Sequence, residues 1–111
     1  MIIDGYDYHF AYTVGAYCDI FDLHLNPAKT MAEQVKITGQ MAVIMSKAYE
    51  DRKKLEDPNY KVNYLTLAQV RGLSINEAVD ILMPEVNEAV KAGAYVSVEA
   101  ETKKDESAVR V

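Results

Sequence analysis

The sequence predicts a mainly α-helical fold with a small N-terminal antiparallel β-hairpin, in which shorter helices pack around one long central helix. Two patterns support this fold class. Residues 31–56 keep a helical spacing of apolar side chains without interruption, and residues 1–13 combine an Asp-Gly turn with strict alternation of aromatic and other side chains. A chain of 111 residues suits one domain. We assign that domain to residues 1–95 and expect a charged, flexible tail at 96–111.

The N-terminal hairpin is predicted from its turn and its aromatic face. Asp4-Gly5 is a two-residue turn of the kind that tolerates positive φ, between strands at residues 1–3 and 6–13. Because a lone hairpin is only marginally stable in water, we expect the aromatic face to pack on the central helix or to be completed by another subunit. The residues of that face are Tyr6, Tyr8, Phe10 and Tyr12.

Two helices are predicted next. The first covers residues 14–25 after a Thr13 N-cap. The second is the central helix, for which we predict Asn26 as the N-cap, Pro27 in the first turn and an end before Pro58. The apolar side chains of the first helix are spaced for one face and are Val14, Tyr17, Cys18, Phe21 and Leu25.

The central helix carries two apolar stripes, whereas an ordinary surface helix carries one. The stripes meet around residues 41–45, so the helix is either a central strut or half of a subunit interface. Its length of roughly 40–45 Å predicts that its last turns project from the domain or rest on a neighbouring chain. One stripe comprises Met31, Val35, Thr38, Ala42, Met45 and Tyr49, and the other Ile37, Met41, Ile44, Ala48 and Leu55.

A short apolar helix or turn is predicted at residues 65–73 and is closed by Gly72. Ser74 and Glu77 then have the spacing of a capping box, which opens a further helix. The inner side of that helix carries Ile75, Val79, Leu82 and Met83.

Pro84 falls inside the pattern of this last helix. A mid-helix proline removes a hydrogen bond and clashes with the preceding turn, so we expect a kink, or a break and restart, before a cap at Gly93. Residues 95–98 follow with brief strand character.

Composition and charge limit the possible functions. The chain has 12 basic and 17 acidic residues and a net charge of −5, which argues against general binding to nucleic acid or anionic membranes. Its single cysteine, Cys18, cannot form an internal disulfide, so we expect a reducing cytoplasm. No apolar run approaches the ~20 residues that span a bilayer. The sequence has no catalytic or cofactor motif, so we expect a protein that is not an enzyme and holds no cofactor.

The one cluster of possible metal ligands is Cys18, Asp19, Asp22 and His24. Cys18 and Asp22 share a helix face that His24 does not, so we expect no metal site and interpret Cys18 as a buried thiol beside solvated carboxylates. His9 is interpreted as a surface side chain. The balanced charges at residues 50–61 predict a solvated helix end.

We predict one surface for a partner and one for self-association. Methionines in the central helix either belong to the core or line an adaptable groove, because flexible methionine side chains suit such grooves. The predicted partner surface comprises Met41, Ile44, Met45 and Ala48. The predicted self-association surface, at the hairpin edge, comprises Tyr6, Tyr8 and Phe10.

Residues 65–83 allow an alternative function. Their sequence resembles a helix-turn-helix with Gly72 in the turn. The would-be recognition helix presents Asn76, Glu77 and Asp80 without a Lys or Arg, whereas phosphate contacts supply much of the affinity for DNA. A transcriptional regulator is therefore the second hypothesis, and nucleic acid is not an expected partner.

The order of these parts resembles that of the tail assembly chaperones of long-tailed bacteriophages, over roughly residues 1–95. In that family an N-terminal hairpin, here with its Asp4-Gly5 turn and aromatic strand, leads into a helix and then a long central helix. A segment like residues 65–70 follows, and then a capped helix pair that ends in Ala-Gly, here Ala92-Gly93. The resemblance is one of pattern, because the family has no catalytic motif to match.

The resemblance implies a non-enzymatic protein that oligomerises and keeps the apolar tape-measure protein soluble while the tail tube polymerises around it. Such a protein acts in the cytoplasm of an infected or lysogenic bacterium. The expected partners are therefore the tape-measure protein and further copies of this chain, with no role for a membrane.

Overall fold

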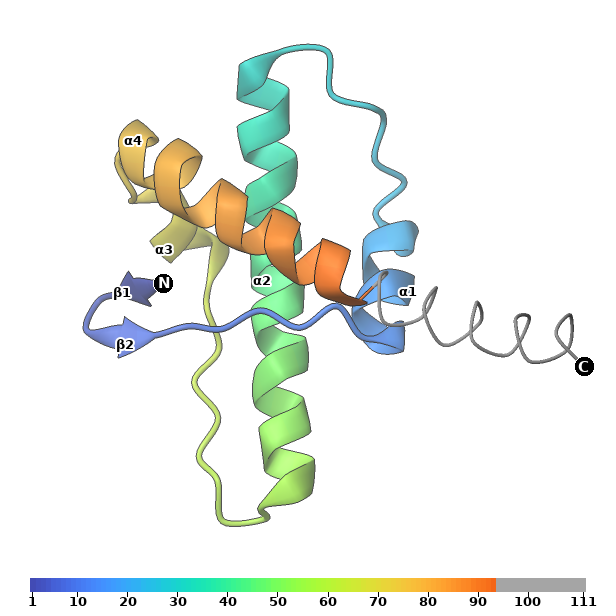
Figure 1. Cartoon of the computed structure of the whole chain (residues 1–111), viewed down its shortest axis with the longest axis vertical. Coiled ribbons are helices and arrows are strands. Elements are labelled where there is room, and N and C mark those ends of the chain that lie inside the picture. The colour runs from blue at the N-terminus through green and yellow to red at the C-terminus, as the bar shows by residue number, and fades with distance from the viewer. Residues whose placement is uncertain (94–111) are drawn as a thin grey trace, which may run out of the picture.

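The computed structural model describes residues 1–93, which form a mainly helical domain around one long helix (Figure 1). The predicted fold class is confirmed, since a two-stranded antiparallel hairpin precedes this helix and shorter helices pack against it. The predictions for residues 95–98 and 96–111 lie outside the described residues. The elements are β1 (Ile2–Ile3), β2 (Tyr6–Asp7), α1 (Val14–Asp22), α2 (Met31–Glu56), α3 (Leu67–Arg71), α4 (Ile75–Glu77) and the π-helical η1 (Ala78–Leu82), followed by α-helix over 83–93.

The hairpin turn forms where it was predicted. Asp4 and Gly5 have φ values of 51° and 78°. A two-residue hairpin turn with positive φ at both positions matches the twist of the flanking strands, and Asp followed by Gly accepts that backbone at low cost. β1 and β2 pair antiparallel across the turn, with Ile3 opposite Tyr6.

The second strand ends at Asp7, and the prediction that it covers residues 6–13 is wrong. Tyr8 still pairs with Met1, since its amide donates to the Met1 carbonyl and its carbonyl accepts from the Met1 amino group, both at 2.8 Å. Within residues 1–93 the pairing across the hairpin goes no further. Residues 8–13 instead cross α2 (Figure 1), where the amide of Ala11 donates a hydrogen bond to the carbonyl of Met45 at 3.0 Å. The aromatic face still packs on the core, as predicted, through Tyr6, Tyr8, Phe10 and Tyr12.

α1 is capped as predicted but ends early. The hydroxyl of Thr13 accepts a hydrogen bond from the amide of Ala16 at 3.1 Å. The prediction of a helix through Leu25 is wrong, because the helix stops at Asp22 and His24 has a φ of 51°. That left-handed backbone ends an α-helix.

α2 has the bounds of the predicted helical pattern, but the predicted start at Asn26 and Pro27 is wrong, because Thr30 is the cap. The hydroxyl of Thr30 accepts a hydrogen bond from the amide of Glu33 at 3.1 Å. The Glu33 carboxylate accepts one from the amide just before the cap at 3.0 Å. This reciprocal pair satisfies backbone donors at the helix start. The helix ends before Pro58, as predicted.

The last helix passes through Pro84 without a break. Ser74 and Glu77 form the predicted capping box at the start of α4. The helix then continues through η1, where the amide of Met83 donates to the carbonyl of Ala78, five residues back. In a regular α-helix the ring of Pro84 would clash with the carbonyl four residues earlier. The wider π-helical turn directly before Pro84 replaces the predicted break and restart.

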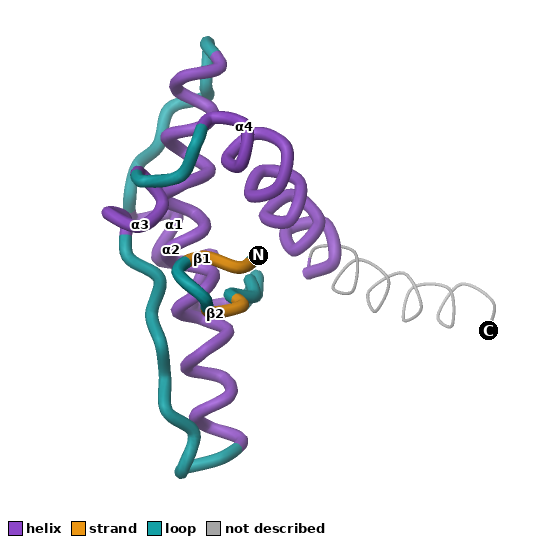
Figure 2. The backbone as a smooth tube through the Cα atoms, turned by 90° about the vertical axis from the view of Figure 1, so that its left-hand side faces the viewer, coloured by secondary structure: helices purple, strands orange, loops and turns teal. Residues whose placement is uncertain are grey.

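The chain itself covers α2 from several sides. α1 packs against it, as do α3 and η1, while residues 8–13 cross it and residues 57–66 run back beside its last turns (Figure 2). Ala42 and Met45 are therefore fully buried. In the described part of the chain α2 is a central strut. Within residues 1–93 we find no helix long and apolar enough to cross a membrane.

Candidate functional site

The predicted partner surface on α2 is not one exposed patch. Met45 is fully buried in the core, whereas Met41, Ile44 and Ala48 are half-buried and pack against that core. Ile44 and Ala48 line a groove of about 310 Å³ between α1 and α2, which also contains the exposed Leu55. In the chain as folded, Met45 cannot contact a partner, because residues 8–13 and the last helix cover the stripe of α2 that contains it.

The predicted self-association surface at the hairpin is also largely covered. Tyr8 is 3% exposed, and its hydroxyl donates a hydrogen bond to Asn63 at 3.3 Å. Tyr6 and Phe10 are half-buried, and Tyr6 lies against Tyr8 with 4.8 Å between ring centroids. Tyr8 therefore belongs to the core, and the hairpin presents only parts of Tyr6 and Phe10.

The predicted apolar face of α1 points outward. Val14, Tyr17 and Phe21 are 82%, 57% and 67% exposed. Ala16 and Ile20, which lie about half a turn away on the helix, face the core instead. The short side chain of Ala16 lets α1 approach α2 closely, so the less apolar side of the helix is the packed one. The spacing of the large apolar side chains predicted the opposite side as the packed one, and that prediction is wrong.

The outward face of α1 also carries the chain's cysteine. Cys18 is exposed, so its interpretation as a buried thiol is wrong. The neighbouring carboxylates do not assemble with it, and no group of three possible metal ligands forms within residues 1–93. His9 is half exposed, as expected for a surface side chain, and its Nε2 lies 3.4 Å from a carboxylate oxygen of Asp7.

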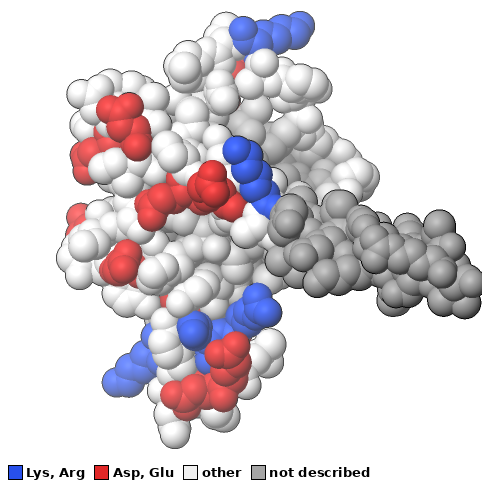
Figure 3. Space-filling view, viewed as in Figure 1, with Lys and Arg blue, Asp and Glu red and all other residues white. Residues whose placement is uncertain are grey.

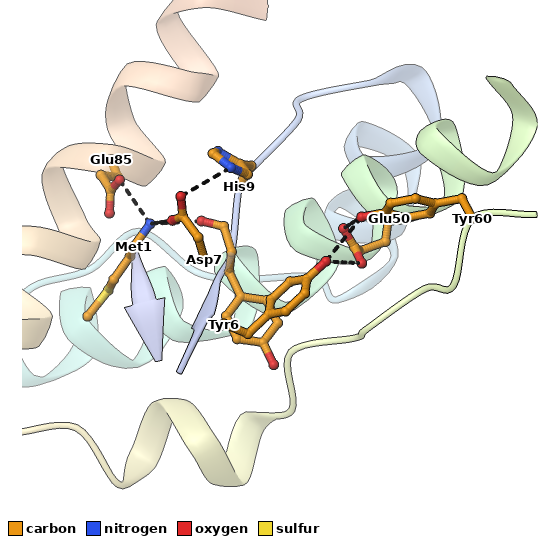
Figure 4. A network of polar contacts seen from close by, with 8 residues as sticks. Met1, Tyr6, Asp7, His9, Glu50, Tyr60 and Glu85 are labelled. Carbon is orange, nitrogen blue, oxygen red and sulfur yellow. Dashed lines mark hydrogen bonds and ion pairs between the residues drawn. The ribbon is translucent and has the colours of Figure 1, made fainter. Parts of the chain in front are cut away.

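Glu50 is a buried carboxylate that sequence reasoning missed. Its exposed fraction is 2%, so the prediction of a solvated helix end at residues 50–61 is wrong at its first residue. The hydroxyls of Tyr6 and Tyr60 donate to its two oxygens at 2.9 and 2.8 Å (Figure 4). The amide of Asn63 donates to Glu50 as well, at 2.7 Å. Its position four residues after Ser46 puts Glu50 on the same side of α2, but only the structure shows that this side is buried.

This network joins three parts of the chain. Glu50 lies on α2, Tyr6 on β2, and Tyr60 in the loop that follows α2. The two hydroxyls also lie 3.0 Å apart. The hydrogen bond with Tyr60, burial and the nearby Glu50 carboxylate raise the pKa of Tyr6 well above its ordinary value. Both carboxylate oxygens of Glu50 accept hydrogen bonds from the protein itself. We therefore interpret the network as one that stabilises the fold and not as a catalytic site.

A second groove lies on the opposite half of α2. It has a volume of about 510 Å³ and is bounded by the first half of α2, by α3 and by the start of the last helix; we call it the α2–α3–α4 groove. Leu82, Ala78 and Val70 form its buried floor, while Leu67 and Ile75 are 42% and 64% exposed at its mouth. The remaining lining residues are Ala32, Val35, Lys36, Thr38, Gly39, Gln40, Arg71 and Leu73.

The charge of this groove differs from that of the surface around it. Its two charged lining residues are Lys36 and Arg71, both exposed, and none of its lining residues is acidic. Acidic side chains lie over α4 and the helix that follows it, whereas basic and acidic side chains lie together around the C-terminal end of α2 (Figure 3). The groove is therefore an apolar site with a basic rim on a chain of net charge −5.

α3 and α4 do follow one another across the turn at Gly72, as the helix-turn-helix hypothesis requires. The exposed residues at the start of the second helix are Asn76, Glu77 and Asp80. The carboxylates of Glu77 and Asp80 would repel a phosphate backbone, which argues against DNA binding by this pair.

The sequence matches no protein-family model, and neither curated proteins nor solved structures contain a significant match.

Proposed function

We propose that this protein is a non-enzymatic tail assembly chaperone, which binds the tape-measure protein in the bacterial cytoplasm and keeps that apolar client soluble during tail assembly. The observation that carries the proposal is the α2–α3–α4 groove, an open apolar site of about 510 Å³. Exposed apolar patches on small soluble domains typically mark binding sites for other proteins. The order of hairpin, helix and long central helix, which resembles that of the chaperone family, supports the same function.

Co-expression with a tape-measure protein tests the proposal. We expect the full chain to retain the client in the soluble fraction and to co-purify with it. Ile75→Glu places a charge in the mouth of the groove and should reduce co-purification at least tenfold. Leu55→Glu is the matched control, because Leu55 is 86% exposed and lies outside the groove. A client that precipitates with or without this protein would contradict the proposal.

Self-association belongs to the same proposal, but we assign it to the outward face of α1 rather than to the hairpin edge. The exposed parts of Val14, Tyr17 and Phe21 amount to roughly 300–400 Å² per copy, since an aromatic side chain carries about 150–250 Å². Stable interfaces bury about 800 Å² per partner. This face alone therefore supports a weak, concentration-dependent dimer of two copies of the chain.

Cys18 provides a direct test of that dimer, because it is exposed on α1 within this face. If two copies pair through α1, mild oxidation at high protein concentration should yield a disulfide-linked dimer, and Phe21→Glu should suppress it. Cys18→Ser combined with Leu55→Cys moves the thiol away from the face and should lose the product. A chain that stays monomeric in light scattering at every concentration would refute self-association.

A further inference from the structure

The dimensions of the α2–α3–α4 groove suit a helix. Along α2 it extends from Ala32 to Gln40, which is a little over two helical turns or roughly 12 Å. A helical segment docked over two turns uses apolar anchors at positions i, i+3, i+4 and i+7. The boundaries of the groove are themselves helices, so a binding segment would meet side-chain ridges and no free strand edge.

Small residues close the floor of this groove. A Cβ atom on Gly39 would lie 3.1 Å from Cγ1 of Val70, so α2 and α3 touch at this point. Ala78, on the third side, is 7% exposed. Gly39, Ala78 and Val70 therefore line the floor together with the buried Leu82, while Leu67 and Ile75 stand at the mouth. That shape leaves room for leucine-sized anchors of a partner.

The rim determines the charge of the partner. Lys36 on α2 and Arg71 on α3 border the groove, and neither forms an ion pair within residues 1–93. An acidic side chain on each flank of a docked helix would meet one of these cations, whereas a basic side chain would meet like charge. The net charge of −5 means that the chain as a whole would repel an acidic segment, so the attraction depends on these two cations.

We propose that the α2–α3–α4 groove binds an acidic amphipathic helix, whose apolar face enters between Leu67 and Ile75 and whose carboxylates pair with Lys36 and Arg71. This inference rests on the proposed client-binding function and names the chemistry of the client segment. It selects the helical parts of a client that carry an apolar face flanked by Asp or Glu.

Two synthetic peptides test this preference on the full chain. Each is a labelled amphipathic helix of about 18 residues, long enough to be helical in water. The first has leucine on one face with glutamate on both flanks, and the second has lysine at the same flanking positions. Fluorescence anisotropy should show at least tenfold tighter binding of the glutamate peptide at low salt, with the difference reduced at about 300 mM NaCl.

Variants separate the groove from the rest of the surface. Lys36→Glu combined with Arg71→Glu should reverse the preference, so that the lysine peptide binds more tightly. Ile75→Glu should abolish binding of both peptides, and Leu55→Glu should leave both unchanged. Circular dichroism melting curves confirm that each variant is folded. Equal binding of the two peptides, an unchanged preference in the charge-reversed variant, or displacement of the peptide by a DNA duplex would overturn the inference.

The peptide assay and the co-purification assay test two separate claims, so either claim can be wrong while the other holds. If the tape-measure protein co-purifies but charge reversal has no effect, the chaperone function stands and the acidic-helix inference is wrong. If the glutamate peptide binds as expected but the tape-measure protein does not, the groove has a different acidic client and the proposed function is wrong.

Discussion

The two halves of α2 have opposite environments. Around Gly39 the helix borders an open groove with exposed apolar side chains at its mouth, whereas around Met45 and Glu50 it is sealed by the hairpin and the loop at residues 57–66. The same helix thus borders a binding surface in its first half and a closed core on the Met45 and Glu50 side of its second half, whereas Ile44, Ala48 and Leu55 line the groove with α1. The difference arises because the N-terminal segment crosses only the second half. Substitutions in the closed half should therefore change stability, and those in the open half should change binding.

The largest expected effect is at Glu50. Glu50→Ala removes the acceptor of three hydrogen bonds and leaves the hydroxyls of Tyr6 and Tyr60 and the amide of Asn63 without it. We expect a loss of about 3–5 kcal/mol in the free energy of unfolding, measured by urea denaturation. Asp51→Ala, on the exposed neighbour, should cost about 1 kcal/mol or less. Equal effects at the two positions would contradict the contrast between buried and exposed carboxylates.

Met45→Ala tests the packing of the closed half. Met45 is fully buried beside Ala42, so truncation leaves a cavity and should cost about 2–5 kcal/mol. Ile75→Ala, on α4 at the mouth of the α2–α3–α4 groove, should cost less than about 1 kcal/mol, because Ile75 is 64% exposed. Thermal and urea unfolding of both variants provide the comparison. A stable Met45→Ala protein would mean that this half of α2 is not closed in solution.

The tyrosine network predicts an alkaline effect. The pKa of Tyr6 in the folded chain is raised above the unfolded value of about 10, so the folded state keeps its proton after the unfolded state has lost it. The contribution of Tyr6 to stability is therefore complete below pH ~10 and is lost as the pH rises above it. Urea midpoints measured across this range should fall less steeply in Tyr6→Phe than in the original chain. Parallel curves would disprove the link.

The smallest effect concerns Ser46. Its hydroxyl is fully buried in α2 and has no hydrogen-bond partner within residues 1–93. Ser46→Ala removes a buried polar group without breaking a bond, so the free energy of unfolding should stay the same or rise by up to about 1 kcal/mol. Differential scanning calorimetry resolves such a change, and a clear loss of stability would show that the hydroxyl is satisfied in solution.

Local signals in the sequence predicted the parts of the fold that depend on neighbouring residues. The Asp4-Gly5 turn, the Thr13 cap and the Ser74 capping box each depend on side chains within four positions, and each occurs as predicted. The cap at Thr30 also depends on nearby side chains, but it was not predicted, because Asn26 and Pro27 are themselves favourable residues for a helix start. A spacing of Thr and Glu three residues apart should have decided between them.

The tertiary arrangement could not be read from periodicity. The inward side of α1 is chosen by the fit of Ala16 against α2, not by the larger Tyr17 and Phe21. The short second strand follows from the two-residue length of β1, and the burial of Glu50 follows from tyrosines far away in sequence. For the candidate site, the helix-turn-helix pattern predicted the helices α3 and α4, which form two sides of the α2–α3–α4 groove. It associated them with DNA binding and not with a protein partner.

Hydrogen–deuterium exchange of the full chain, with and without the tape-measure protein, tests the central claim most directly. The account predicts that the client slows exchange at residues 32–40 and 67–78, which border the α2–α3–α4 groove, while exchange around Met45 and Glu50 stays slow in both states. Slower exchange confined to other segments, with no change at the groove, would contradict the assignment of the open half of α2 to client binding.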